Sequence, residues 1–282
     1  MNILTFDIEE WFHLLDNEST KTENEWTNYE VRIHENMNRI FDLLDRNKAS
    51  GTFFVLGWIA EKYPEVVKEI AARGYEIGSH THLHQLVYSQ NKQQFKNDVE
   101  KSIKYLEDIS QKKVRCFRAP GFSITESNIW AFEALHELGI EIDSSVFPAN
   151  RSHGGFPSYG NSKPSLIKYN GVELKEMPIN YATVFNKPII YSGGGYFRLF
   201  PYALIRKWTR ESDYVMTYFH PRDFDAKQPI IQDLSRTRKF KSYVGLKSAE
   251  KKLDQWLKEF DFMDIQTAEK LINWKKVPIV SL

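Results

Sequence analysis

Apolar and polar residues follow two different periods along this chain, and the two periods alternate. Residues 2–8 are a short apolar run of the kind that forms a buried strand. Residues 29–47 instead repeat apolar side chains at helical spacing. The predicted strands are 2–8, 51–56, 77–80, 114–117 and 140–143, and the predicted helices are 29–47, 64–73, 93–111 and 126–138.

This alternation predicts how the elements are connected. Strands that are joined by helices usually run parallel, with right-handed crossovers. Polar residues stand where these strands end, at Asp7, His80, Arg118 and Asp143. In barrels of parallel strands that are joined by helices, the active site lies at the carboxyl ends of the strands. We therefore expect an α/β fold with its functional residues at that end.

The pattern breaks between about residues 148 and 195, where glycine, proline and serine are frequent. A stretch of this length inside a compact domain is usually functional, so we interpret it as a loop-rich insertion in a single domain that covers residues 1–282. A strand is expected to return at 175–179. The remaining predictions are helices at 201–211 and 248–260 and strands at 214–219 and near 262–267.

Composition and charge argue against several classes of function. The formal net charge of the chain is +1, so it lacks the global field that marks nucleic-acid and membrane-surface binders, and we expect no nucleic-acid partner. Cys116 is the only cysteine, and no secretion signal or run of about 18 apolar residues is visible. These features lead us to expect a cytoplasmic protein without a transmembrane segment.

Three histidines follow the predicted strand that ends near residue 80. His80 and His84 are four residues apart, so they would share one face if the chain turned into a helix after Ser79, with His82 pointing elsewhere. Two neutral imidazoles on one face can hold a divalent ion. Such a pair also occurs by accident, as solvent-facing or structural histidines. The acidic cluster at residues 7–10, which ends the first apolar run, favours the metal site.

The strand-end residues together suit a metal-assisted hydrolase. One carboxylate and two histidines would be ligands, a second carboxylate would be the base, and a separate histidine the acid. Asp7 and Glu9 lie on one face of a strand, because side chains alternate along it. The alternative for either acid is a structural ion pair.

Five ordered motifs then resemble those of the NodB-type polysaccharide deacetylases, carbohydrate esterase family four. They are TFDIEEWFH at 5–13, GTFFVLG at 51–57, EIGSHTHLH at 76–84, FRAPGFS at 117–123 and DSSVFP at 143–148. Two further stretches, SGGGYFR at 192–198 and YFHP at 218–221, resemble the subgroup found in bacterial exopolysaccharide and surface-glycan gene clusters.

The resemblance implies a distorted (β/α) barrel, often seven-stranded, that removes N-acetyl groups from sugars with one divalent ion. Zinc is expected, with Co²⁺, Ni²⁺ or Mn²⁺ as alternatives. By position, Asp7 would be the general base, His80 and His84 metal ligands, Arg118 the residue that orients Asp7 and holds its pKa down, and His220 the general acid.

The first motif departs from the family pattern. Two adjacent aspartates and a glycine are usual there, whereas this chain has Asp7-Ile8-Glu9-Glu10. Strand alternation favours Glu9 as the acidic metal ligand, and Glu10 is the alternative.

Other residues are weaker candidates. Residues 193–195 suggest a tight loop whose backbone approaches a sugar. Five aromatic residues are candidates for stacking on a sugar, although packing is the more ordinary role for each. They are Trp11, Phe156, Tyr159, Tyr191 and Tyr196.

The sequence thus predicts a metal-dependent deacetylase in the biosynthesis of a bacterial surface glycan. Its substrate would be an N-acylated sugar or oligosaccharide, free or carried on a lipid or a nucleotide. One alternative is a hydrolase of another non-peptide C–N bond on the same barrel. Another is a glycan-binding protein with a degenerate site, against which the presence of Asp7, His80, His84 and His220 counts.

Overall fold

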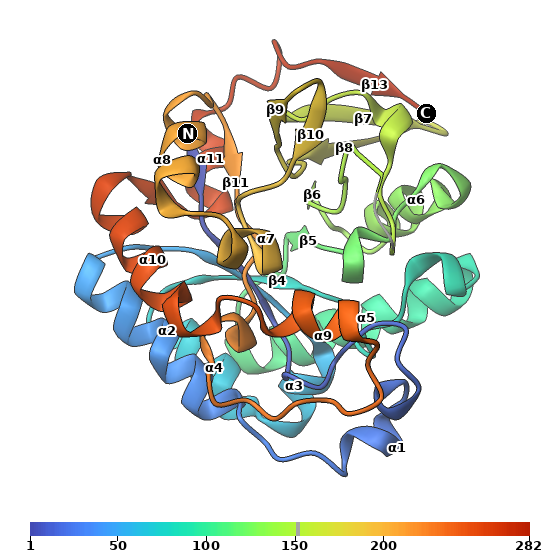
Figure 1. Cartoon of the computed structure of the whole chain (residues 1–282). Coiled ribbons are helices and arrows are strands. Elements are labelled where there is room, and N and C mark those ends of the chain that lie inside the picture. Colours follow the sequence, from blue (N-terminus) through green and yellow to red (C-terminus); the bar gives the residue numbers. More distant parts are fainter. Residues whose placement is uncertain (151–152) are drawn as a thin grey trace. The chain divides into compact units, whose positions relative to one another are not determined.

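Parallel strands followed by helices make up most of the chain in the computed structural model, which describes residues 1–150 and 153–282 (Figure 1). The chain forms two units, and each is assembled from separate stretches of sequence. The first unit consists of residues 1–51 and 181–264, and the second of residues 52–180 and 265–282. The units are described in turn.

The second unit contains a mostly parallel sheet. β3 (Thr52–Val55), β4 (Glu76–Ser79), β5 (Cys116–Phe117) and β6 (Ile142–Asp143) pair in this order, each parallel to the next. The sheet continues through the segment predicted to be loop-rich. There β8 (Val172–Glu176) runs parallel to β6, β7 (Ser165–Tyr169) antiparallel to β8, and β13 (Ile279–Ser281) parallel to β7.

The helices of the second unit follow the predicted pattern, with α3 and α11 as additions. They are α3 (Gly57–Lys62), α4 (Pro64–Ala72), α5 (Lys92–Ser110), α6 (Trp130–Glu137) and α11 (Ile265–Leu271). Pro64 opens α4, where its missing N–H is no loss. Asn91 caps α5 by accepting a hydrogen bond from the Gln94 N–H, and Phe95 is among the apolar residues that α5 buries.

The first unit is built around the N-terminal strand. β1 (Asn2–Ile3) lies between β11 (Val215–Met216) and β12 (Phe262–Met263), and both pairings are parallel. β2 (Thr5–Ile8) continues from β1, and the Asp7 N–H donates to the Phe219 carbonyl at 2.7 Å. In this parallel register Phe6 is the partner of Phe219.

Helices and one hairpin complete the first unit. The helices are α1 (Glu23–Trp26), α2 (Ile33–Asn47), α7 (Gly194–Leu199), α8 (Tyr202–Arg210), α9 (Arg236–Tyr243) and α10 (Leu246–Glu259). The hairpin pairs β9 (Ala182–Val184) with β10 (Lys187–Ile189).

The predicted α/β fold with mostly parallel strands is confirmed, while closure into a barrel, the number of barrel strands and the single domain stay predictions. The strand expected near 262–267 is wrong beyond Met263. Ile265 begins α11 instead, because Thr52 Oγ1 accepts its N–H at 2.8 Å and caps the helix. None of the helices in the described ranges is long and apolar enough to cross a bilayer.

Candidate active site

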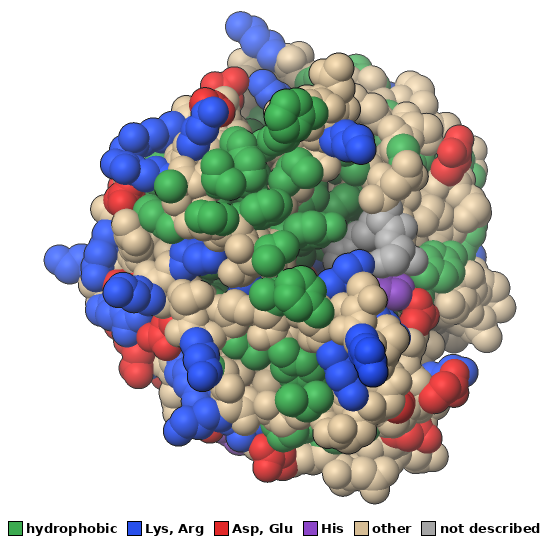
Figure 2. All heavy atoms as spheres, viewed as in Figure 1, with side chains coloured by type: hydrophobic (Ala, Val, Ile, Leu, Met, Phe, Trp, Pro, Cys, Tyr) green, Lys and Arg blue, Asp and Glu red, His purple; other side chains and the backbone are tan. Residues whose placement is uncertain are grey.

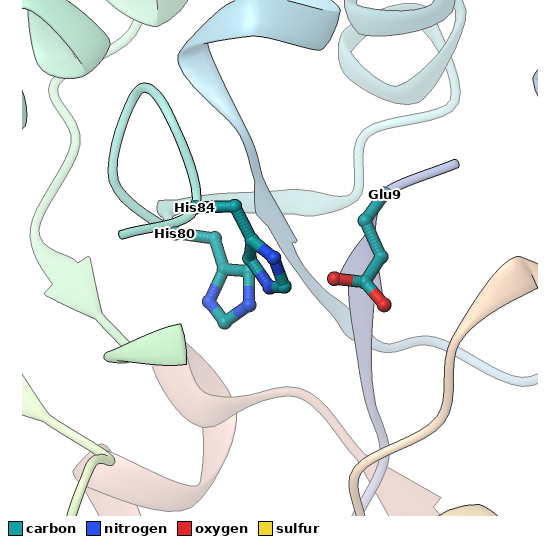
Figure 3. Close-up of side chains that lie close together, drawn as sticks. All are labelled: Glu9, His80 and His84. Carbon is teal, nitrogen blue, oxygen red and sulfur yellow. The ribbon is translucent and has the colours of Figure 1, made fainter. Parts of the chain in front are cut away.

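The histidine motif lies on a loop after β4, so the helix considered after Ser79 is wrong. Thr81 and His84 adopt left-handed backbone conformations, with φ of 70° and 56°. The Asp98 carboxylate accepts the N–H groups of His82 at 2.7 Å and Leu83 at 3.1 Å, which holds the loop in place of a helix. The loop nevertheless brings the ring centroids of His80 and His84 to 5.3 Å from each other (Figure 3).

The protonation of His80 follows from its hydrogen bond. Its Nδ1 lies 2.7 Å from the Arg118 carbonyl oxygen, which can only accept, so Nδ1 carries the proton. The lone pair is then on Nε2. Metal-binding histidines are usually oriented in this way by a backbone carbonyl. His80 and His84 are both buried.

His82 points away from this pair, as expected. Its ring stacks on Tyr105 with centroids 5.8 Å apart, and its Nε2 lies 3.4 Å from a Glu61 oxygen. The role of His82 is therefore in packing α3 and α5 around the loop.

Arg118 follows β5 and is completely buried. Its guanidinium donates to the Ser144 carbonyl at 3.2 Å and to Ser144 Oγ at 3.0 Å, and it lies 4.3 Å from the centre of the Phe54 ring. Arg118 is therefore a core residue. The predicted action of Arg118 on Asp7 stays a prediction, because Asp7 belongs to the first unit.

Two buried carboxyl groups face each other across β6 and β8, a pair that the sequence analysis missed. Asp143 and Glu176 are partners in the parallel register, and both are fully buried. Burial raises the pKa of Glu176 well above its usual range, and the neighbouring Asp143 raises it further. Ser145 Oγ donates to Asp143 at 2.6 Å. Glu176 therefore holds the proton of this pair.

The first unit brings three of the predicted residues together. His220 Nε2 lies 3.9 Å from Asp7 Oδ2 and 3.9 Å from Glu9 Oε1. Asp7 and Glu9 are buried at the end of β2, whereas His220 is only partly buried. The acid and base suggested by the resemblance thus lie beside each other, next to the favoured ligand Glu9.

Asp223 and Arg198 hold His220 in place, and the sequence analysis assigned a role to neither. Asp223 Oδ2 accepts the His220 backbone N–H at 2.9 Å and lies 3.0 Å from His220 Nδ1, while Asp223 Oδ1 lies 3.1 Å from Arg198 Nε. The sequence contains a signal for the contact between Asp223 and His220. An acid three residues after His220, with Pro221 between them, is the pattern of a capped turn.

The charges around His220 favour its protonated form. Burial alone would lower the pKa of His220, but the carboxylates of Glu9, Asp223 and Asp7 outweigh it and raise the pKa to about 8. The ring can therefore carry a proton at neutral pH, with Nδ1–H directed to Asp223 and Nε2–H toward the acids of β2.

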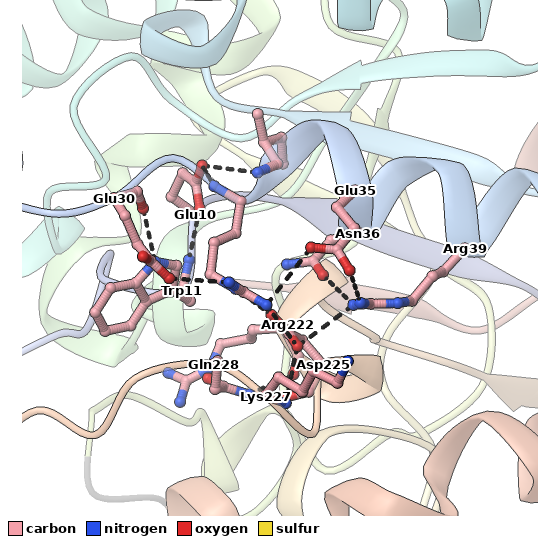
Figure 4. A network of polar contacts seen from close by, with 12 residues as sticks. Glu10, Trp11, Glu30, Glu35, Asn36, Arg39, Arg222, Asp225, Lys227 and Gln228 are labelled. Carbon is pink, nitrogen blue, oxygen red and sulfur yellow. Dashed lines mark hydrogen bonds and ion pairs between the residues drawn. The ribbon is translucent and has the colours of Figure 1, made fainter.

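Glu10 has a different task from Glu9. Its Oε1 accepts the N–H groups of Arg32 at 2.7 Å and Ile33 at 2.8 Å, at the start of α2. Burial raises the pKa of Glu10 to about 7, although these hydrogen bonds oppose the rise. Figure 4 shows Glu10 in a network that continues to Asp225, which lies 2.5 Å from Arg32 Nε. Glu10 therefore fixes the start of a helix.

The weaker candidates mostly have structural roles. Trp11, Phe156, Tyr159 and Tyr191 are buried in the core, and only Tyr196 of the five stacking candidates is exposed, at 50%. Residue 193 also has a packing reason to be glycine. A Cβ there would lie 2.1 Å from the Tyr218 carbonyl oxygen, so its backbone approaches Tyr218 and not an open sugar site.

Family models divide the chain into two matched segments. The polysaccharide deacetylase model matches residues 4–141. Residues 4–141 are therefore similar to polysaccharide deacetylases. Residues 144–270 match a model described as a domain of unknown function, DUF3473. The deacetylase segment includes Asp7, Glu9, His80, His84 and Arg118, whereas His220 lies in the second segment.

Two curated relatives from Bacillus cereus are named peptidoglycan-N-acetylglucosamine deacetylase. One is 34% identical over 96 residues, which cover 34% of this chain and 35% of the relative. The other is 30% identical over 103 residues, which cover 36% of this chain and 46% of the relative. The chain thus spans about a third and just under half of the lengths of these relatives.

Solved structures share the fold. A Mycobacterium smegmatis protein, described as a polysaccharide deacetylase candidate, has a TM-score of 0.69 at 18% identity, covering 99% of this chain and 92% of that chain. A family 4 carbohydrate esterase pseudoenzyme from Bacillus anthracis has a TM-score of 0.52 at 13% identity, covering 94% of this chain and 64% of that chain. Because the same fold includes a pseudoenzyme, activity must be argued from the residues.

Proposed function

We propose that this protein is a metal-dependent hydrolase that removes the N-acetyl group from an N-acetylated sugar. The observation that carries the proposal is the arrangement in the first unit, where His220 Nε2 lies 3.9 Å from both Asp7 and Glu9. Amide hydrolysis needs a base for the water and an acid for the leaving nitrogen, and this arrangement offers both.

The metal ligands in this proposal are His80 and His84 of the second unit and Glu9 of the first (Figure 3). Two imidazoles and one carboxylate are a donor set that suits catalytic zinc. The hydrogen bond from His80 Nδ1–H to the Arg118 carbonyl supports the assignment, since it leaves Nε2 as a ligand atom. Glu9 is preferred to Glu10, whose Oε1 already accepts two N–H groups of α2.

Each side chain then has one chemical role. A divalent ion held by these ligands would lower the pKa of water and polarise the acetyl carbonyl. Asp7 accepts the proton of the water that adds to the carbonyl carbon. His220 donates a proton from Nε2 to the sugar nitrogen as the C–N bond breaks, so that acetate and a free amine leave. Arg118 orients Asp7 in this scheme.

The substrate class can be narrowed by the relatives. The two Bacillus cereus relatives are named for peptidoglycan N-acetylglucosamine, which supports an N-acetylglucosamine-containing glycan as substrate. A bacterial surface polysaccharide, as the motifs at 192–198 and 218–221 suggest, is the second candidate. His220 lies in the segment of unknown function, so the proposal gives that segment a catalytic residue.

Release of acetate tests the proposal. The purified protein would be incubated with N-acetylglucosamine oligomers, peptidoglycan and lipid-linked N-acetylated sugars, after loading with zinc and after chelation. His80→Ala and His84→Ala should lose both metal and acetate release, while His136→Ala, on the exposed face of α6, should keep both. Glycan binding without acetate release under any metal would instead indicate a binding protein.

A further inference from the structure

Large apolar side chains are exposed on four neighbouring elements of the first unit. They are Phe185 between β9 and β10, Tyr196 and Leu199 of α7, Leu204 of α8 and Phe240 of α9, exposed by 96%, 50%, 47%, 38% and 58%. We call these five residues the apolar face. Figure 2 shows hydrophobic side chains gathered over the hairpin, α7 and α8, with Lys and Arg around them.

Packing contacts tie these elements into one surface. The Tyr191 ring, just after the hairpin, lies 5.4 Å from Trp208 of α8. Arg198 of α7 donates to the Lys241 carbonyl of α9 at 3.1 Å and to the Ser242 carbonyl at 2.8 Å. The apolar face is therefore a feature of one packed unit and not a set of unrelated side chains.

Phe185 gives the strongest indication that the apolar face contacts a partner. It stands at the hairpin turn with a φ of 48°, and Asn186 follows with a φ of 59°. A left-handed conformation suits Asn but is unfavourable for a bulky aromatic residue. Nearly complete exposure of the ring to water is unfavourable as well. A residue that combines both features is expected to contact an apolar partner.

The charge around this face is strongly positive. Residues 181–210 contain five Lys or Arg and no acid, and residues 234–249 again contain five and no acid. The net charge of +1 for the whole chain conceals this concentration. Helix α9 contributes Arg236, Arg238, Lys239 and Lys241, and it has no buried residue. Some of these charges are neutralised. The buried Arg198 pairs with Asp223 at 3.1 Å, and Arg206 pairs with Glu259 at 2.7 Å.

We propose that the apolar face and its basic surroundings dock on the surface of a bilayer that contains anionic lipids. Apolar side chains enter the boundary between headgroups and acyl chains, Tyr stays at the headgroup level, and Lys and Arg attract the anionic headgroups. A second copy of the chain is a poorer partner. Symmetric pairing through this face would set one basic region against another.

Vesicle sedimentation tests the docking. The protein should sediment with vesicles of phosphatidylcholine mixed with phosphatidylglycerol, and much less with phosphatidylcholine alone. Phe185→Ser should weaken partitioning by about tenfold or more, because it removes the aromatic ring that would be buried in the bilayer. The matched control is Leu271→Ser, on another exposed side chain of the second unit, exposed by 64%. It should bind like the wild type.

The contribution of Lys and Arg to vesicle binding is tested with separate variants. Arg236→Glu combined with Lys241→Glu should lower partitioning by about tenfold or more, since each basic residue near an anionic surface contributes about fivefold. Lys62→Glu combined with Lys68→Glu makes the same charge change on exposed residues of α3 and α4 and should have a much smaller effect. Added salt should weaken binding of the wild type.

A fluorescent label reports the contact directly. Cys116 is the only cysteine and is buried, so Phe185→Cys offers one accessible thiol for an environment-sensitive dye. Its emission should rise and shift to the blue with anionic vesicles, whereas a dye at Leu271→Cys should not respond. The proposal is overturned if no variant alters vesicle binding, if the dye at 185 stays in water, or if Phe185→Ser abolishes a dimer instead. None of these measurements depends on deacetylase activity.

Discussion

Asp223 accepts two hydrogen bonds from His220, one from the backbone N–H at 2.9 Å and one from Nδ1 at 3.0 Å. Because a carboxylate can only accept, Nδ1 must carry a proton, and Nε2 is left facing Asp7 and Glu9. Arg198 fixes the other oxygen of Asp223 at 3.1 Å. The orientation of the proposed acid therefore depends on Asp223, which Arg198 holds in turn.

Asp223→Asn is the first test of this arrangement. An amide can turn its NH₂ toward Nδ1, which must then accept a hydrogen bond and carry no proton, so the doubly protonated ring that acts as the acid is disfavoured. We expect turnover to fall by about 10²- to 10⁴-fold, the usual contribution of general acid catalysis, with metal content unchanged. Rates of acetate release and metal analysis of the same preparations give the answer.

A matched aspartate separates positioning from general loss of charge. Asp233→Asn changes an acid that accepts a hydrogen bond from Ser19 Oγ at 3.0 Å instead of one from His220. It should keep nearly full turnover. If Asp223→Asn also kept full turnover while remaining folded, Asp223 would not orient a catalytic histidine.

The second prediction distinguishes Glu9 from Glu10. Glu9→Gln should weaken metal binding, because a neutral amide is a poor ligand. Glu10→Gln should spare metal binding, since its oxygen can still accept the N–H groups of Arg32 and Ile33. Glu10→Ala should lower the free energy of unfolding by about 1 kcal/mol through loss of this cap. Metal titration and urea unfolding measure the two effects, and the reverse order of metal affinities would make Glu10 the ligand.

The sequence predicted those parts of the site that depend on periodicity and local spacing. Strand alternation set Asp7 and Glu9 apart from Glu10, and the structure gives Glu10 a separate task at α2. The convergence of His80 and His84 was expected on a helix but is achieved by a loop. Left-handed Thr81 and His84 and the distant Asp98 create that loop, and residue spacing carries no signal for either.

Pairings between distant residues could not be predicted in the same way. Asp143 was recognised at a strand end, but Glu176 becomes its neighbour only through the register of β6 and β8. The segment at 148–195 was expected to be mostly loop. Only one strand was expected there, at 175–179, but the segment adds both β7 and β8 to the sheet. A tight turn at Asn170 and Gly171, which both have positive φ, joins them.

The third prediction concerns pH and the Asp143–Glu176 pair. Burial raises the pKa of Glu176 well above its ordinary value of 4.5, so the folded protein holds a proton that the unfolded chain releases. This contribution to stability is fully present below 4.5 and declines as the pH rises above it. Glu176→Gln carries no such proton. The variant should therefore gain stability relative to the wild type as the pH rises.

Urea unfolding below the ordinary pKa of Glu176 and at neutral pH measures this difference. Glu173→Gln is the control, because Glu173 lies on the same strand but is exposed and pairs with Lys168 at 3.3 Å. It should change stability little at either pH. A Glu176→Gln difference that is the same at both pH values would show that Glu176 does not hold a proton in the folded protein.

The last prediction separates the base from the ligands. Asp7→Asn keeps the shape of the side chain and the backbone hydrogen bond from Asp7 N–H to Phe219, but it removes the basicity. A carboxylate that acts as the base must be free to accept the proton of water, so we expect Asp7 not to be a metal ligand. We expect turnover to fall by about 10²- to 10⁴-fold while metal occupancy stays near that of the wild type. His220→Ala should reduce turnover in the same way, again without loss of metal. Nearly full turnover of Asp7→Asn on a confirmed substrate would refute the assignment and make Glu9 and Glu10 the next bases to test.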